Sequence, residues 1–234
     1  MPSPNDHQRI YAVGDIHGRH DLLKDILHQI ATDNAARPAA DSHLIFLGDY
    51  IDRGPDSHGV VDTLLYGLPK GFQTHFLMGN HERLLLDALD EEERMPLWLA
   101  NGGVAMLSSY ARASKARESI IGVNGAGDHM LPIDHRAFFE GLELRLTCGD
   151  YLFVHAGVRP GVELDRQSPH DLLWIREPFL SYDGSFGKIV VHGHTPVEAP
   201  ELKPNRIGID TGAVFTGRLT AIRLEGQDQH LMAT

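Results

Sequence analysis

The feature that most constrains the fold is a predicted strand closed by glycine and a polar residue, which occurs three times before residue 81. The strands span 10–13, 43–47 and 74–78, and they are closed by Gly14-Asp15, Gly48-Asp49 and Gly79-Asn80. The first of them, Ile10-Tyr11-Ala12-Val13, is a short apolar run, which indicates a buried strand that ends in a turn. Helical spacing predicts a first intervening helix with an apolar face formed by Leu22, Leu23, Ile26, Leu27 and Ile30. A second helix is expected from Pro55-Asp56. Strands that alternate with helices predict a parallel α/β sheet with right-handed crossovers.

The chain after residue 81 has a different pattern. Residues 82–140 are predicted to be mostly helical, with a break at Pro96 and a glycine-rich patch at 122–127. Strands are then expected at 142–148, 151–155, 188–192, 206–210 and 219–224, with a hairpin turn at Gly149-Asp150. The predicted fold class is therefore α/β, with two packed mixed β-sheets flanked by helices. Because no linker-like stretch divides the chain, residues 1–234 are expected to form a single domain in which 82–140 is a cap-like helical insertion.

Charge and cysteine content exclude several classes of protein. Lys and Arg number 21 against 32 Asp and Glu, and the net charge of −11 disfavours broad binding to nucleic acid or to an anionic membrane. The single cysteine, Cys148, rules out an intramolecular disulfide and suggests a reducing compartment. No apolar run reaches the roughly 18 residues of a membrane span, and the first residues lack the pattern of a signal peptide. We therefore expect a cytoplasmic protein.

Polar side chains that suit metal ions follow five of the predicted strands. They stand in Gly14-Asp15-Ile16-His17-Gly18, Gly48-Asp49-Tyr50-Ile51-Asp52-Arg53-Gly54, Gly79-Asn80-His81-Glu82, Val154-His155-Ala156-Gly157 and His192-Gly193-His194-Thr195-Pro196. Functional residues of α/β sheets collect beyond the carboxyl ends of strands, and Asp, Asn and neutral His suit Mn, Fe or Zn. One of the 15 histidines alone, or one Gly-Asp turn, would indicate nothing specific. The five together, in this order, predict a site for divalent metal ions.

This set of motifs resembles the calcineurin-like metallophosphoesterases. Within them it is similar to the phosphoprotein phosphatase family, especially the bacterial and bacteriophage lambda type. Three further runs also look like the lambda-type enzymes, namely Trp98-Leu99-Ala100-Asn101-Gly102-Gly103, Trp174-Ile175-Arg176-Glu177 and Ile209-Asp210-Thr211-Gly212-Ala213-Val214-Phe215. The resemblance spans nearly the whole chain, from Tyr11 to about Leu224, and it implies the metallophosphoesterase fold.

The resemblance also implies a dinuclear metal site. Asp15 and His17 would bind the first ion, Asp49 would bridge both ions, and the second would be completed by Asn80, His155 and His194. We expect two divalent ions, with Mn²⁺ favoured and Fe or Zn as alternatives. His192 is not chosen, because the family places its ligand in Gly-His. Pro196 stands where other metallophosphoesterases carry a further histidine, which favours the phosphoprotein phosphatase branch.

Four further residues are implied to act in catalysis by direct attack of a metal-bridging hydroxide. His81 would protonate the leaving oxygen as general acid, and Asp52 would orient His81 and stabilise its charged form. Arg53 and Arg176 would hold the phosphate, because a planar guanidinium matches phosphate oxygens. The alternative for each arginine is a plain ion pair, with Glu177 as the partner of Arg176.

The expected function is that of a metal-dependent phosphomonoesterase, a serine/threonine protein phosphatase whose partners are phosphorylated proteins or peptides. Lambda-type relatives also accept phosphotyrosine, so dual specificity is an expectation as well. A symmetrical dinucleoside tetraphosphate (Ap4A) hydrolase shares the same core motifs and is the close alternative. A non-enzymatic metal-binding module is the alternative of another class, but such a module would lack a ligand, the general acid or an arginine. No feature of the sequence favours a particular oligomeric state.

Overall fold

A computed structural model describes residues 2–121 and 131–234 of the protein. The strands of this part are β1 Gln8–Val13, β2 Asp41–Phe46, β3 Gln73–Phe76, β4 Arg145–Cys148, β5 Tyr151–Val154, β6 Ile189–His192, β7 Glu201–Leu202, β8 Arg206–Gly208, β9 Thr220–Glu225 and β10 Asp228–Ala233. The α-helices are α1 His20–Ala35, α2 Ser57–Tyr66, α3 Asn80–Asp90, α4 Met95–Trp98, α5 Val104–Ile121, α6 Ile133–Glu140, α7 Pro169–Trp174 and α8 Ala213–Thr216. Shorter helical turns span Glu92–Arg94, Leu99–Gly103 and Leu164–Arg166.

The strands form two five-stranded mixed sheets. The first has the order β10-β9-β1-β2-β3, in which β1, β2 and β3 are parallel and β9 and β10 are antiparallel. The second has the order β4-β5-β6-β8-β7, with β5, β6 and β8 parallel. The parallel opening, the hairpin at Gly149-Asp150 and the two mixed sheets are thus confirmed. Two short or exposed edge strands, β7 and β10, were not predicted, because neither contains an apolar run.

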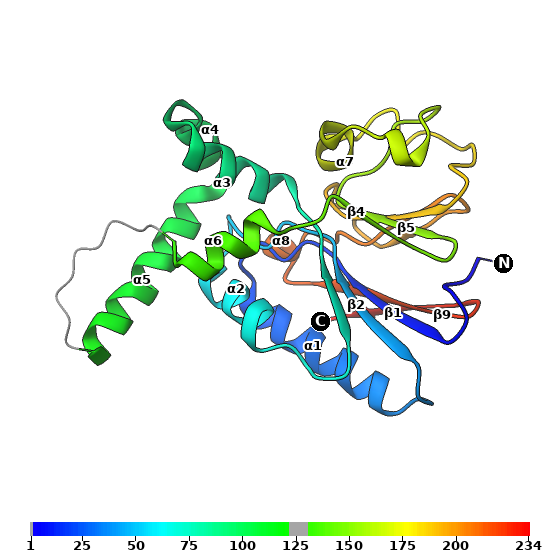
Figure 1. Ribbon diagram of the computed structural model, residues 1–234, viewed down its shortest axis with the longest axis horizontal. Helices are drawn as coiled ribbons and strands as arrows, with labels where there is room; N and C mark the ends of the chain where they lie inside the picture. Colours follow the sequence, from blue (N-terminus) through cyan, green and yellow to red (C-terminus); the bar gives the residue numbers. More distant parts are fainter. Residues whose placement is uncertain (1, 122–130) are drawn as a thin grey trace.

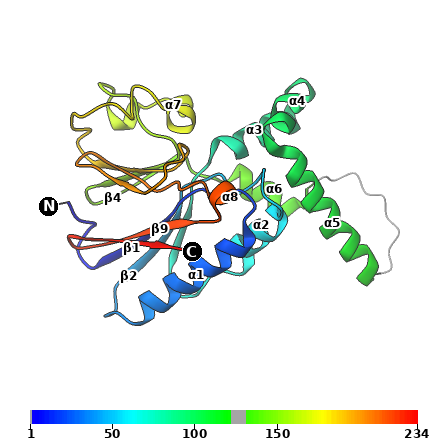
Figure 2. The same ribbon diagram turned by 180° about the vertical axis from the view of Figure 1, so that it is seen from behind.

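The two sheets pack face to face, and helices cover their outer faces (Figures 1 and 2). Strand β1 shows why both faces are apolar: Tyr11 and Val13 pack in the core beneath the helices, whereas Ile10 and Ala12 pack in the core between the sheets. Side chains alternate between the two faces of a strand, so a strand that is buried on both sides reads as a continuous apolar run. Helices α1 and α2 lie against the first sheet, and α7 lies against the second.

The segment predicted to be helical contains α3, α4, α5 and α6, which extend to one side of the sheets (Figure 1). The predicted break at Pro96 is instead the first turn of α4, a position that tolerates proline because its missing N–H has no partner there. The glycine-rich patch at 122–127 falls outside the described residues. Throughout 2–121 and 131–234, no helix combines the length and apolar character that crossing a membrane requires.

Candidate metal centre

Loops that follow strands of both sheets meet at one place in the molecule. Backbone N–H groups of Ile16 and His17, after β1, donate to the carbonyl of Asp49, after β2, at 3.1 and 2.8 Å. In the second sheet, the N–H of Gly193 donates to the carbonyl of His155 at 2.8 Å. Within each sheet, the loops are therefore fixed to each other by backbone hydrogen bonds.

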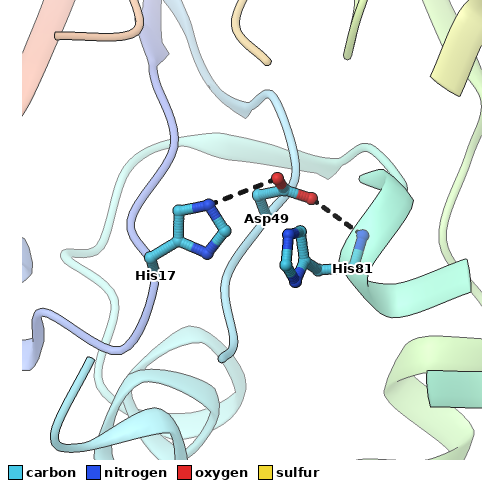
Figure 3. A group of neighbouring side chains, drawn as sticks. All are labelled: His17, Asp49 and His81. Carbon is cyan, nitrogen blue, oxygen red and sulfur yellow. Dashed lines mark hydrogen bonds and ion pairs between the residues drawn. The ribbon is translucent and has the colours of Figure 1, made fainter. Parts of the chain in front are cut away.

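Asp49 stands at the centre of this convergence. Its carboxylate lies 3.4 Å from Nε2 of His17 and accepts the backbone N–H of His81 at 3.0 Å (Figure 3). It also lies 3.5 Å from Nε2 of His155. One possible ligand atom from each of Asp49, His17 and His81 falls within 4.8 Å of the others, and the same holds for Asp49, His155 and His194. Asp49 is common to both groups, which is the placement that a bridging ligand requires, and the first group contains His81 in place of the expected ligand Asp15.

The histidines present unprotonated nitrogens to this carboxylate. Nδ1 of His17 lies 2.8 Å from the carbonyl of Ile51, and Nδ1 of His155 lies 2.9 Å from the carbonyl of Leu47. A carbonyl only accepts, so Nδ1 carries the proton in both rings and Nε2 is left with its lone pair. Burial lowers the pKa of His17 to about 3 despite the neighbouring Asp49, and burial also lowers the pKa of His155. Both imidazoles are therefore neutral at pH 7, as metal ligation requires.

Asn80 provides the clearest test of whether a cation fits. Its Oδ1 lies 2.9 Å from Nε2 of His155 and 2.9 Å from Nδ1 of His194. Burial lowers the pKa of His194 to about 3. An amide oxygen that faces the lone pair of His155 at this distance is repelled unless a cation lies between them. The donor set of Asn80, His155 and His194 therefore fits a divalent ion.

The buried carboxylates of Asp15 and Asp210 also indicate that a cation fits this site. Asp15 is 3 % exposed and its oxygens accept the backbone N–H of His194 at 3.0 and 3.3 Å. Burial, together with the charges of Asp210 and Asp49, raises the pKa of Asp15 well above its usual value. Burial also raises the pKa of Asp210 to about 6. Carboxylates crowded in this way need positive charge beside them. Asp210 was not predicted as a site residue, although it stands in the run 209–215 that resembles the lambda-type enzymes.

The local backbone is unusual at these positions. Positive φ values between 45° and 70° occur at His17, Asp49, Asp52, Arg53 and His194. Side-chain-bearing residues rarely adopt this region, and they do so mostly where the surroundings over-determine the conformation. The close approach of Gly54 to the His17 loop is one such constraint, because a Cβ on Gly54 would lie 1.9 Å from the His17 carbonyl oxygen.

Glu82 fixes the loop that follows β2 by hydrogen bonds to its backbone. Its carboxylate accepts backbone N–H groups of Asp49 at 2.9 Å, Tyr50 at 2.8 Å and Gly79 at 2.9 Å. It is fully buried at the start of α3. Sequence reasoning assigned Glu82 no role although it closes the Gly-Asn-His-Glu motif. The structure identifies it as the residue that positions Asp49 relative to α3.

His81 and Asp52 form a buried pair next to Asp49. Nδ1 of His81 lies 2.7 Å from Oδ2 of Asp52, and the indole Nε1–H of Trp98 donates to the same carboxylate at 3.1 Å. Burial lowers the pKa of His81, but the charge of Asp49 and the hydrogen bond to Asp52 outweigh it, so the net shift is upward. Nε2 of His81 is buried with no hydrogen-bond partner among the described residues. The pair can thus hold a proton on a nitrogen that is left for another molecule.

A cavity of about 380 Å³ opens over the centre, and both predicted arginines line it. Its lining includes Asp49, Arg53, Asn80, Asn101, Trp174, Arg176, His194, Pro196 and Phe215. Nη1 of Arg53 lies 2.8 Å from Nε2 of His17, so the positive guanidinium group is next to one of the candidate ligands. Arg176 is exposed and has no ion pair within the described part of the chain, and the pairing with Glu177 is not formed.

His192 is directed elsewhere, although it is close in sequence. Its Nε2 lies 3.3 Å from Nη1 of Arg206 and its ring packs edge-on against Phe179.

The structure gathers all ten residues that were predicted from the sequence at or beside Asp49 and the cavity.

Two packed mixed sheets whose strand ends gather Asp, Asn and His define a hydrolase of the metallophosphoesterase class. Comparison with known proteins agrees: residues 8–214 match the family model described as calcineurin-like phosphoesterase, and the chain belongs to this family. The family implies divalent metal ions, and the donor set described above fits them.

Several relatives align over nearly the whole chain. Serine/threonine-protein phosphatase 1 of Salmonella typhimurium is 31% identical over 93% of each chain. The asymmetrical bis(5'-nucleosyl)-tetraphosphatase PrpE of Oceanobacillus iheyensis is 26% identical over 92% of this chain and 88% of its own. A crystal structure described as that of a candidate diadenosine tetraphosphatase superposes with a TM-score of 0.68 at 24% identity, covering 98% and 95% of the two chains. That last likeness shows the shared fold.

Proposed function

We propose that the protein is a metal-dependent phosphomonoesterase that removes phosphate from phosphoserine and phosphothreonine in proteins, with phosphotyrosine as an additional substrate. The observation that carries this proposal is that Arg53 and Arg176 line one cavity together with three of the candidate metal ligands, Asp49, Asn80 and His194. Guanidinium groups recognise phosphate oxygens, and a cluster of Asp, Asn and His recognises divalent ions. A phosphoryl group is the kind of substrate that uses both. The 31% identical relative named as a serine/threonine-protein phosphatase supports the choice of substrate.

Each residue has a task in this reaction. Divalent ions, held by Asp15, His17, Asp49, Asn80, His155 and His194, would supply Lewis acidity that activates water and offsets phosphoryl charge. The two arginines hold the phosphoryl oxygens from the cavity side. His81 donates the proton on Nε2 to the leaving oxygen, and Asp52 keeps Nδ1 engaged so that Nε2 is the donor. Trp98 fixes the Asp52 carboxylate in turn.

Hydrolysis of dinucleoside tetraphosphates is the second candidate. It is favoured by the relative named as an asymmetrical bis(5'-nucleosyl)-tetraphosphatase, which aligns over almost the same length. Phe215, 73 % exposed at the cavity rim, offers an aromatic face on which an adenine base could stack. The same acid and the same arginines would serve a phosphoanhydride.

The deciding experiment compares kcat/KM for a phosphoserine peptide, a phosphotyrosine peptide and diadenosine tetraphosphate on one Mn²⁺-loaded preparation. A preference for the phosphoserine peptide supports the proposal. A preference for diadenosine tetraphosphate overturns it in favour of the second candidate. Its products then separate symmetrical cleavage, which gives two ADP, from asymmetrical cleavage, which gives ATP and AMP.

A further inference from the structure

A second group of metal-ligating side chains lies away from the cavity, between helices α2, α5 and α6. It consists of His58 and Asp62 on α2 and His135 on α6, and one possible ligand atom from each lies within 4.8 Å of the others. His58 and Asp62 are four residues apart, so both point from the same face of their helix. His135 is fully buried, and Asp62 keeps 39 % of its side chain exposed.

The distances in this group are close to those of a coordination sphere. Oδ1 of Asp62 lies 3.0 Å from Nε2 of His135, and Oδ2 lies 3.5 Å from Nδ1 of His58. Ligand atoms bonded tetrahedrally to Zn²⁺ at 2.0–2.1 Å are about 3.3 Å apart. The His58 and His135 rings have centroids 5.1 Å apart, so both flank one carboxylate. Small side-chain adjustments are enough to direct the three donors to one ion.

A residue behind His135 completes the arrangement. The hydroxyl of Tyr110, on α5, lies 2.8 Å from Nδ1 of His135. A metal-bound imidazole commonly has such a partner on its other nitrogen, which fixes the ring and its tautomer. The surroundings are also acidic, because the carboxylates of Asp62, Asp134 and Asp56 lie near the Tyr110 hydroxyl. This local negative potential favours a cation.

We propose that His58, Asp62 and His135 bind one divalent transition-metal ion of the Zn²⁺ class, separate from the centre at the strand ends. Two imidazoles and one carboxylate are a common zinc donor set, and the exposed side of Asp62 leaves room for water as a fourth ligand. The bound ion ties α6 to α2 directly, and through Tyr110 it also ties α5. The competing explanation is a plain hydrogen-bond chain from Tyr110 through His135 to Asp62.

The test counts zinc in the full-length protein. Wild type, Asp62→Asn, His58→Gln and His20→Gln are dialysed to equilibrium against the same buffered Zn²⁺, and metal per chain is measured by elemental analysis. His20→Gln is the matched control, because His20 forms another partly buried His–Asp pair, with Asp56 at 3.0 Å, outside the cluster. Asp62→Asn keeps the shape of the side chain, and far-UV circular dichroism identifies any variant that does not fold.

We expect Asp62→Asn and His58→Gln each to bind one zinc ion fewer per chain than wild type, and His20→Gln to bind the same number. Zn²⁺ should also raise the Tm of wild type more than that of the two cluster variants. Equal zinc counts in all four proteins overturn the proposal. A lower Tm for Asp62→Asn with an unchanged count identifies the hydrogen-bond chain instead. If one cluster variant does not fold, the other decides. Because only the difference between variants is used, the result does not depend on how many ions the strand-end centre holds.

Discussion

Replacing His81 by asparagine tests the chemistry at the strand ends most directly. Asparagine retains a polar group at this buried position but cannot deliver a proton to a leaving oxygen. If His81 Nε2 is the donor, the loss must depend on how basic that oxygen is. A serine alkoxide needs the proton in order to leave, whereas a nitrophenolate leaves readily without it. We therefore expect a large loss on phosphoserine peptides and a clearly smaller loss on p-nitrophenyl phosphate.

The size of each loss follows from the contacts. General acid catalysis contributes about 10²–10⁴-fold, so His81→Asn should lower kcat/KM on a phosphoserine peptide by about that factor. Asp52 acts through a 2.7 Å hydrogen bond to Nδ1 in a pair that is almost fully buried. A hydrogen bond to a charged group is worth about 1.5–3 kcal/mol, which corresponds to about 10–150-fold in rate. Asp52→Asn should thus show the same dependence on the leaving group with a smaller amplitude.

The assay is kcat/KM for each variant across phosphate monoesters of graded leaving-group pKa, at fixed metal and pH. Arg53→Ala is the contrast, because Arg53 lines the cavity that holds the phosphoryl group common to every substrate. Arg53→Ala should lower kcat/KM for every substrate by a similar factor. If His81→Asn also lowers kcat/KM by the same factor for every substrate, His81 is a positioning residue and the proton comes from elsewhere.

Three further outcomes are expected. Asp49→Asn removes the carboxylate that is shared by two groups of possible ligands. The variant should bind at least one metal ion fewer per chain by elemental analysis and lose activity by orders of magnitude. Two tightly held ions in this variant would contradict the assignment. Gly54→Ala, whose Cβ would meet the His17 carbonyl oxygen at 1.9 Å, should destabilise the fold by about 1–3 kcal/mol in urea, whereas Gly67→Ala, with its closest contacts at 3.3 Å, should destabilise it clearly less. Asp33 bonds to Tyr11, Arg37 and Arg223, and although burial opposes it these bonds lower its pKa from 3.8 to about 2. The ionised Asp33 carboxylate should stabilise the folded state by about 1–2 kcal/mol above pH 4, and this contribution should be lost as the pH falls through 2. The free energies of unfolding in urea of wild type and Asp33→Asn should therefore differ at pH 6 and converge near pH 2. A difference that stays constant with pH would refute this.

Much of the architecture could be predicted from the sequence because its causes are local. A strand buried on both faces needs a continuous apolar run, and residues 10–13 and 44–47 supply one each. Asp56 could be expected at a helix start, and its side chain caps α2 by accepting the N–H of Gly59 at 3.0 Å. Strand β10 has no such signal, because its residues are mostly exposed and it is held only along one edge, by β9.

The supporting residues of the site escaped prediction because their partners are distant in the sequence. Glu82 supports the site by accepting the N–H groups of Asp49 and Tyr50, more than 30 residues earlier in the chain. Trp98 supports it by donating its indole N–H to Asp52, 46 residues earlier. Spacing along the chain carries no information on such contacts. The same holds for His135, which reaches Asp62 across 73 residues.

The backbone of the site adds an argument that does not depend on any bound ion. His17, Asp49, Asp52, Arg53 and His194 all have φ values between 45° and 70°. Glycine would adopt this region without the cost of about 1–3 kcal/mol that each other residue incurs. If these positions served only to turn the chain, glycine would be the more stable choice at each of them. The chain instead places there an imidazole, a carboxylate or a guanidinium, as expected if the proposed function of these side chains, and not the turn alone, determines which residues stand there. Local preference and global fold disagree where a protein carries function, and here the disagreement falls on five of the ten residues that the strand-end motifs single out.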